Sequence, residues 1–137
     1  MFMLMEQKDT ITRSIASEKA MITNIESSIE RLEEVAQSIE NDQQTIETTK
    51  VEISDIVIDP SVWRGSKQRT YKEEMETYTE DIQSVSQYTE YIRGTIKAEL
   101  QRRRDQLLTA QNTLISLETS LTSVNSEIQQ QRRSNNG

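Results

Sequence analysis

The sequence lacks cysteine and histidine altogether, and it contains one proline, three glycines and one tryptophan in 137 residues. The chain therefore has no thiolate nucleophile, no imidazole base and no disulfide, and it lacks the ligands of most structural zinc sites. Carboxylates alone would have to hold any metal, so we expect no metal, no cofactor and no enzymatic activity. We also expect no membrane insertion, because a spanning helix needs about 20 consecutive apolar residues.

Basic residues are also in the minority, with 16 Lys and Arg against 23 Asp and Glu, a net charge of -7. We expect no nucleic-acid binding, because neutralising phosphates requires a basic face. The short run Arg102-Arg103-Arg104 is interpreted as solvated helix surface. The apolar stretch from Met1 to Met5 has neither the basic start nor the length of a secretory signal. These features predict synthesis in the cytoplasm, and any export would use machinery that accepts folded helical cargo.

Apolar residues in the first half recur at alternating steps of four and three, which is the period of a coiled-coil seam. The pattern predicts a helix over 7–58. Fourteen positions follow this rule from residue 11 to residue 57, and Glu18, Gln43 and Lys50 are the three polar interruptions. The other eleven are apolar: Ile11, Ile15, Ile22, Ile25, Ile29, Leu32, Ala36, Ile39, Ile46, Ile53 and Val57.

The second half repeats this spacing and predicts a second helix over 67–131. Thr89 and Arg103 interrupt its seam, and two steps of four meet between Ile96 and Leu100, where we expect a bend beside Gly94 rather than a domain boundary. Its apolar positions are Tyr71, Met75, Tyr78, Ile82, Val85, Ile92, Ile96, Leu100, Leu107, Ala110, Leu114, Leu117, Leu121, Val124 and Ile128. Tyr71 and Tyr78 are expected in the core, whereas Tyr88 and Tyr91 lie off the seam and are open to a partner helix.

The break between the halves covers 59–66 and contains Pro60, which cannot continue a helix because it lacks an N–H donor. Two starts of the second helix are open: Asp59 as N-cap before Pro60, or Ser66 as N-cap after a turn at Gly65. An irregular turn from Trp63 to Gly65 favours the second. The residues 132–137 have no apolar anchor and are expected to form a flexible tail.

The predicted fold is therefore all-α: residues 1–137 form one long antiparallel hairpin of two coiled-coil-like helices. A pair of helices buries only one seam, so it has little interior. We expect further helices from a partner, or from another copy of the chain, to complete the bundle.

The only tryptophan lies at this predicted bend. The motif reads Trp63-Arg64-Gly65, and an aromatic residue, Tyr71, follows eight positions after the tryptophan. This pattern resembles the WXG-motif family of small helical hairpins that are handled by type VII (ESX) secretion. The chain departs from that family in its greater length. It also lacks the Tyr-x-x-x-Asp/Glu export signal, because no acidic residue lies four positions after any tyrosine.

A longer hairpin with Trp-x-Gly and no acidic signal is similar to the small α-helical partners of LXG-type polymorphic toxins. The resemblance implies a chaperone-like targeting protein that binds the toxin's helical N-terminal domain, with or without a second small helical partner, and presents it to the secretion ATPase. It implies a cytoplasmic location, with co-secretion as the alternative. The implied recognition residues are Trp63, Gly65, Tyr71, Val62 and Ile58. The helical seam is represented by Ile22, Ile25, Ile29, Leu32, Ile39, Leu107, Leu114, Leu117 and Leu121.

Other functions remain open at this point. The chain could be a self-associating coiled-coil scaffold, or an immunity or regulatory protein encoded beside a toxin. Trp63 could also serve only to plug the end of the hairpin, with its indole packed on Val57 or Val62. The interruptions Glu18, Gln43 and Lys50 could set the register of the helices, or could simply be tolerated.

Overall fold

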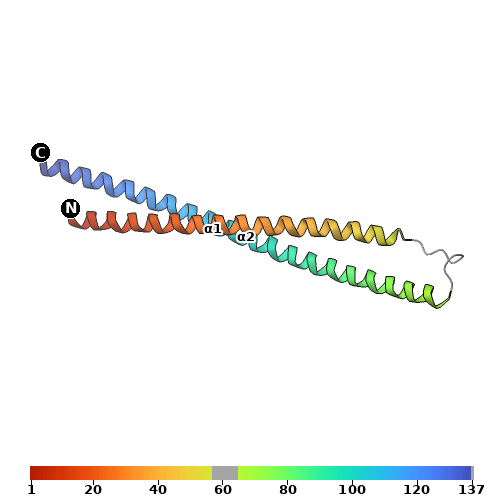
Figure 1. Cartoon of the computed structure of the whole chain (residues 1–137). Coiled ribbons are helices and arrows are strands. Elements are labelled where there is room, and N and C mark those ends of the chain that lie inside the picture. Colours follow the sequence, from red (N-terminus) through yellow and green to blue (C-terminus); the bar gives the residue numbers. More distant parts are fainter. Residues whose placement is uncertain (57–64, 137) are drawn as a thin grey trace. The chain divides into compact units, whose positions relative to one another are not determined.

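Two long helices make up the described part of the chain in the computed structural model, which describes residues 1–56 and 65–136 (Figure 1). Helix α1 spans Phe2–Ser54 and helix α2 spans Ser66–Asn136, and no strand occurs in these ranges. The two helices pack as an antiparallel hairpin, which confirms the predicted all-α fold. Scarce Gly and Pro, together with the heptad spacing of apolar residues, account for their length.

The helix ends differ from the sequence-based boundaries by one to five residues. Helix α1 begins at Phe2 instead of residue 7, because Met, Leu and Glu are good helix formers, and the Met5 N–H donates to the Met1 carbonyl at 3.0 Å. It ends at Ser54, where the Ile56 N–H donates to the Ile53 carbonyl at 3.1 Å in a tightened last turn. Helix α2 continues to Asn136, beyond the expected end at 131.

The start of α2 is set by Gly65. Its φ of 90° lies in the region that side-chain-bearing residues avoid, and its carbonyl accepts the Arg69 N–H at 3.2 Å as the first backbone bond of the helix. Ser66 is therefore the first helical residue, and Gly65 occupies the cap position, one residue before the second of the two open alternatives.

Contacts divide the chain into two units, and each contains a pair of antiparallel helix segments. Unit 1 consists of Met1–Arg31 and Leu100–Gly137, so the two ends of the chain belong to the same unit (Figure 1). Unit 2 is Leu32–Glu99, which includes the bend. Helix α2 passes through Gly94 without interruption, and the division between the units follows Glu99, next to the predicted slip.

The core of unit 1 is a narrow line of apolar side chains. Its members come from both helices: Ile15, Ile25, Ile29, Leu100, Ala110, Val124 and Ile128. Ala110 and Ile128 are the most enclosed, each 4% exposed. None of the described side chains is more than 98% buried, as expected when only two helices meet.

The seam of α2 departs from the predicted one within unit 2. Tyr78 and Val85 were expected to face α1, yet they are 52% and 53% exposed. The neighbouring seam positions Met75, Ile82 and Ile92 are half-buried as predicted, and Ser86 is half-buried in place of Val85. The prediction was therefore wrong at Tyr78 and Val85 alone, where a strict 3.5-residue period does not follow the local contact between the two helices.

Threonine hydroxyls on the helix surface bond to their own helix. Twelve threonines among the described residues donate to the carbonyl four positions earlier, for example Thr79 to Met75 at 2.8 Å and Thr12 to Lys8 at 2.7 Å. These donors are satisfied locally. The polar surface is thus largely inert, and any partner would be selected by apolar and charged side chains.

Replacing Gly65 with alanine is expected to lower the free energy of unfolding by about 1–2 kcal/mol, because a Cβ is disfavoured at its positive φ. Apart from its chain neighbours, no atom of residues 1–56 and 65–136 lies within 4 Å of that Cβ, so the cost is conformational and not steric. Gly94→Ala is the matched control: Gly94 lies within α2, also with open space around it, and the change should raise stability by about 1 kcal/mol. Urea unfolding, followed by circular dichroism, measures the free energy of unfolding of both variants. Equal changes in the two variants would contradict the assignment of Gly65 as the cap.

Ile128→Ala should lower the free energy of unfolding by about 2–3 kcal/mol, because Ile128 is 4% exposed in the core of unit 1. Ile115→Ala, at a position 61% exposed on the same helix, should change it by less than about 0.5 kcal/mol. The same urea titration compares the two variants. A similar loss for both would show that the line of buried residues is not the core.

Candidate functional site

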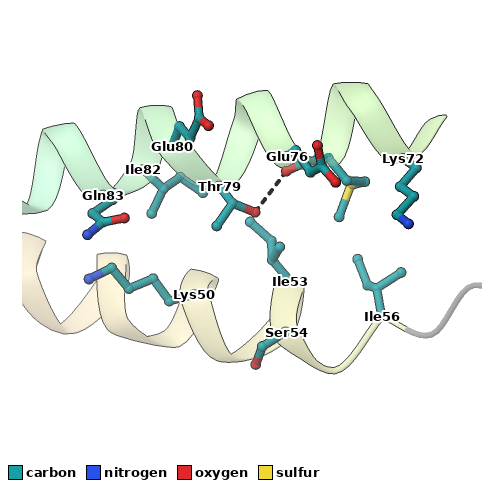
Figure 2. Close-up of a pocket in the computed structure, with 11 residues that line it drawn as sticks. Lys50, Ile53, Ser54, Ile56, Lys72, Glu76, Thr79, Glu80, Ile82 and Gln83 are labelled. Carbon is teal, nitrogen blue, oxygen red and sulfur yellow. Dashed lines mark hydrogen bonds between the residues drawn. The ribbon is translucent and has the colours of Figure 1, made fainter. Parts of the chain in front are cut away.

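An open apolar groove lies between α1 and α2 in unit 2, close to the bend (Figure 2). Its volume is about 690 Å³. Four apolar side chains line it: Ile53, Ile56, Met75 and Ile82. Ile53 and Ile82 lie on the predicted seam and are only half-buried, and Ile56, just beyond the end of α1, is 48% exposed. The two helix segments thus leave apolar surface uncovered where a further helix could pack.

Charged and polar side chains form the rim of this groove. Helix α1 contributes Lys50, and α2 contributes Lys72, Glu76 and Glu80. No Lys or Arg nitrogen within the described ranges lies within 4.0 Å of the carboxylates of Glu76 and Glu80. These two carboxylates are thus available to a cation from another molecule.

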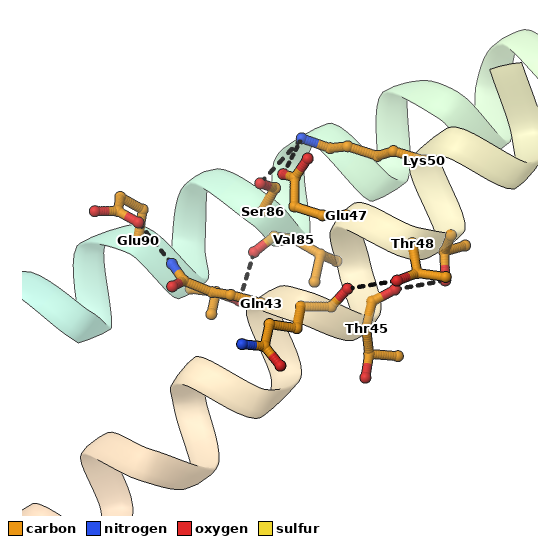
Figure 3. A network of polar contacts seen from close by, with 11 residues as sticks. Gln43, Thr45, Glu47, Thr48, Lys50, Val85, Ser86 and Glu90 are labelled. Carbon is orange, nitrogen blue, oxygen red and sulfur yellow. Dashed lines mark hydrogen bonds and ion pairs between the residues drawn. The ribbon is translucent and has the colours of Figure 1, made fainter.

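A polar network next to the groove joins the two helices of unit 2 (Figure 3). The Gln43 Nε2 donates to the Glu90 Oε2 at 2.6 Å, and the Lys50 Nζ donates to the Ser86 Oγ at 3.1 Å. Lys50 also pairs with Glu47 at 3.4 Å. Gln43 bonds to residue 90, and Lys50, which is later in α1, bonds to residue 86, which is earlier in α2. The two bonds therefore define the antiparallel register of the two segments.

Two of the polar interruptions in the predicted seam therefore contact the opposite helix. Gln43 and Lys50 are half-buried, and both bond across the interface, which supports their interpretation as register-setting residues. Glu18 is also half-buried and lines a separate groove in unit 1 with Met21 and Arg102.

The structure describes two of the five predicted recognition residues, Gly65 and Tyr71. Trp63, Val62 and Ile58 lie outside the described residues. Gly65 begins α2 with its positive φ, and Tyr71 is half-buried on the face of α2 toward α1.

The predicted seam residues all lie at inward positions of the helices. Ile25 and Ile29 are buried in unit 1. The remaining seven are half-buried: Ile22, Leu32, Ile39, Leu107, Leu114, Leu117 and Leu121. Leu32 and Ile39 belong to unit 2, and the others belong to unit 1.

Sequence reasoning missed Ser86 and Glu90 as cross-helix partners of Lys50 and Gln43. The available signal was the polar interruption itself: a polar residue at a seam position needs a polar partner on the facing helix. Finding that partner requires the register, which the sequence pattern leaves open by whole heptads.

The described residues offer little for metal or membrane chemistry. No group of three or more acidic side chains in residues 1–56 and 65–136 is arranged to hold a metal ion. In the same ranges neither helix contains a stretch apolar enough to cross a bilayer.

A double-mutant cycle between Gln43 and Glu90 should give a coupling energy of about 1 kcal/mol, because the bond at 2.6 Å ends on a carboxylate but is exposed to water. The variants are Gln43→Ala, Glu90→Ala and the double mutant, compared by urea unfolding. Gln37 and Glu90 serve as the control pair, because the Gln37 side chain bonds Asn41 on its own helix and should show no coupling to Glu90. Additive losses for Gln43 and Glu90 would contradict the cross-helix bond.

Among known protein families, the model described as YwqH-like matches residues 6–126, which cover most of both helices and the residues between them. The chain has no match among curated proteins and none among solved structures.

Proposed function

Because this chain belongs to the YwqH-like family, we propose that it is a non-enzymatic targeting partner that binds the helical N-terminal domain of a type VII-secreted, LXG-type toxin. The observation that carries the proposal is the balance of apolar surface. Fourteen large apolar side chains among the described residues are exposed, and seven apolar residues are buried. Single exposed apolar residues are ordinary, but Ile56 lies on an open apolar groove, and apolar surface gathered in this way supports coverage by another protein.

The exposed aromatic side chains support a helical partner in particular. Tyr78, Tyr88 and Tyr91 are 52%, 66% and 71% exposed, and all three lie on α2 within unit 2. Tyrosine is enriched where proteins meet, because its ring buries a large area and its hydroxyl keeps a polar contact. A bundle in which a toxin helix packs on this part of α2 would cover them.

The Trp-x-Gly motif supports the link to type VII secretion. Gly65 adopts a conformation that suits glycine, as expected if the motif ends a turn and begins a helix. In this proposal Trp63 contributes to the surface that the secretion ATPase recognises, and the partner toxin supplies the acidic signal that this chain lacks. The chain acts in the cytoplasm and either stays there or leaves with the toxin.

A self-associating scaffold is the second candidate, and the seam that runs through both helices favours it. Sedimentation of the purified chain separates the candidates, because a scaffold forms a stable homodimer or filament alone. The targeting partner forms a tight complex only with the toxin's N-terminal domain. An immunity protein would instead bind the toxin's C-terminal toxic domain, so the same toxin is tested as two separate fragments.

Trp63→Ala should leave helicity and binding to the toxin's N-terminal domain unchanged and should abolish export of that toxin. Circular dichroism, co-purification and the amount of toxin in the culture medium measure the three properties. Gln111→Ala, at an exposed polar position of unit 1, is the control and should leave both toxin binding and export intact. Normal export with Trp63→Ala would remove the role of the motif.

A further inference from the structure

Burial is distributed unequally between the two units. All seven buried apolar residues belong to unit 1, at positions 15, 25 and 29 of α1 and 100, 110, 124 and 128 of α2. Within residues 32–56 and 65–99, the described part of unit 2, no side chain is buried. The same kind of seam is therefore closed in unit 1 and left half open in unit 2.

The groove of unit 2 is where this open seam is most accessible. Ile53 and Ile56 come from the end of α1, and Met75 and Ile82 come from the first turns of α2 (Figure 2). Met75 and Ile82 are seven residues apart and so lie on one face of α2. Apolar residues from two helices at this spacing form the holes into which the side chains of a third helix insert.

Charge is also distributed unequally. Unit 2 contains 15 Asp and Glu against 7 Lys and Arg, a net charge of −8, whereas unit 1 contains 8 against 9, a net charge of +1. Of the charged side chains that line the groove, Lys50 and Lys72 are basic and Glu76 and Glu80 are acidic. Lys50 pairs with Glu47 and bonds Ser86, whereas Glu76 and Glu80 lie four residues apart on one face of α2 and have no basic partner among the described residues.

We propose that the groove of unit 2 binds an amphipathic helix whose apolar stripe is flanked by Lys and Arg. Its apolar side chains cover Ile53, Ile56 and Met75, and its cations pair with Glu76 and Glu80. The inference rests on the proposed function in one respect, that this helix belongs to a partner protein. A second copy that packed its unit 2 on this groove would bring a second charge of −8 to the same surface, which disfavours that arrangement.

Two synthetic helical peptides test the proposal on the full chain. Both have Leu at a and d positions; one has Lys at the flanking e and g positions, and the other has Glu there. By calorimetry at low salt, about 50 mM NaCl, the Lys peptide should bind at least about tenfold more tightly than the Glu peptide, and added salt should narrow the difference. Failure of both peptides to bind, or equal affinities, would overturn the proposal.

Paired variants locate the binding surface. Glu76→Lys with Glu80→Lys should weaken binding of the Lys peptide by at least about tenfold. Glu118→Lys with Glu127→Lys, exposed on unit 1, makes the same change in charge and should alter it by less than about twofold. A second pair of variants tests the apolar contacts by the same change at two exposed isoleucines, Ile56→Asp on the groove and Ile115→Asp on unit 1. Only Ile56→Asp should weaken binding of the Lys peptide. Equal effects within either pair would overturn the proposal.

The same four variants are then measured against the purified N-terminal domain of the LXG-type toxin that the proposed function assigns to this chain as its partner. Weakening by the unit 2 variants alone supports both the groove and the proposed function. If the domain binds and the unit 2 variants lower its affinity no more than the unit 1 controls do, the groove is not the binding site. The proposed function then stands. If the domain does not bind the wild-type chain, the proposed function falls, and the two peptides decide the groove.

Discussion

The structure depends on one constraint: two helices that pack against each other can bury only one narrow seam. In unit 1 this seam encloses seven apolar side chains, and even the most enclosed, Ala110 and Ile128, keep 4% of their surface exposed. Hydrophobic stabilisation grows with the apolar area removed from water, so a core this thin contributes little beyond the entropy that long helices lose on folding. The chain accordingly gains more from a further helix than a compact domain of the same length would.

The helices could be predicted from local sequence chemistry. The register between the two helices could not. The four-and-three spacing placed Ile25 and Ile29 on the inner face, and both are buried. The same rule failed at Tyr78 and Val85 although it held at Ile82, because the positions that face the other helix also depend on how the two helices oppose each other. The groove could not be located in advance, since it depends on which turns of α1 and α2 oppose each other. In unit 2 the hydrogen bonds from Gln43 and Lys50 to α2 establish which turns oppose each other.

The two units use the same heptad spacing with different residues, and this difference explains their unequal burial. Unit 1 places branched apolar residues such as Ile15 and Val124 at seam positions. Unit 2 places Gln43, Lys50, Ser86 and Thr89 at half-buried positions on the facing surfaces. Burying such groups is costly unless they are hydrogen-bonded. A two-helix segment with these residues therefore cannot close as tightly as one lined with isoleucine and leucine.

This arrangement suits a segment that is completed by another protein. Gln43 bonds to Glu90 and Lys50 bonds to Ser86 before any partner arrives, so a third helix could cover these groups without leaving them unpaired. Polar pairs at seam positions cost stability and select one register and one partner. Glu76 and Glu80 on the rim of the groove add selection by charge, because they attract a basic helix and repel the acidic unit 2 of a second copy. Low burial, polar register contacts and excess negative charge thus all occur in unit 2, the segment that a further helix would complete.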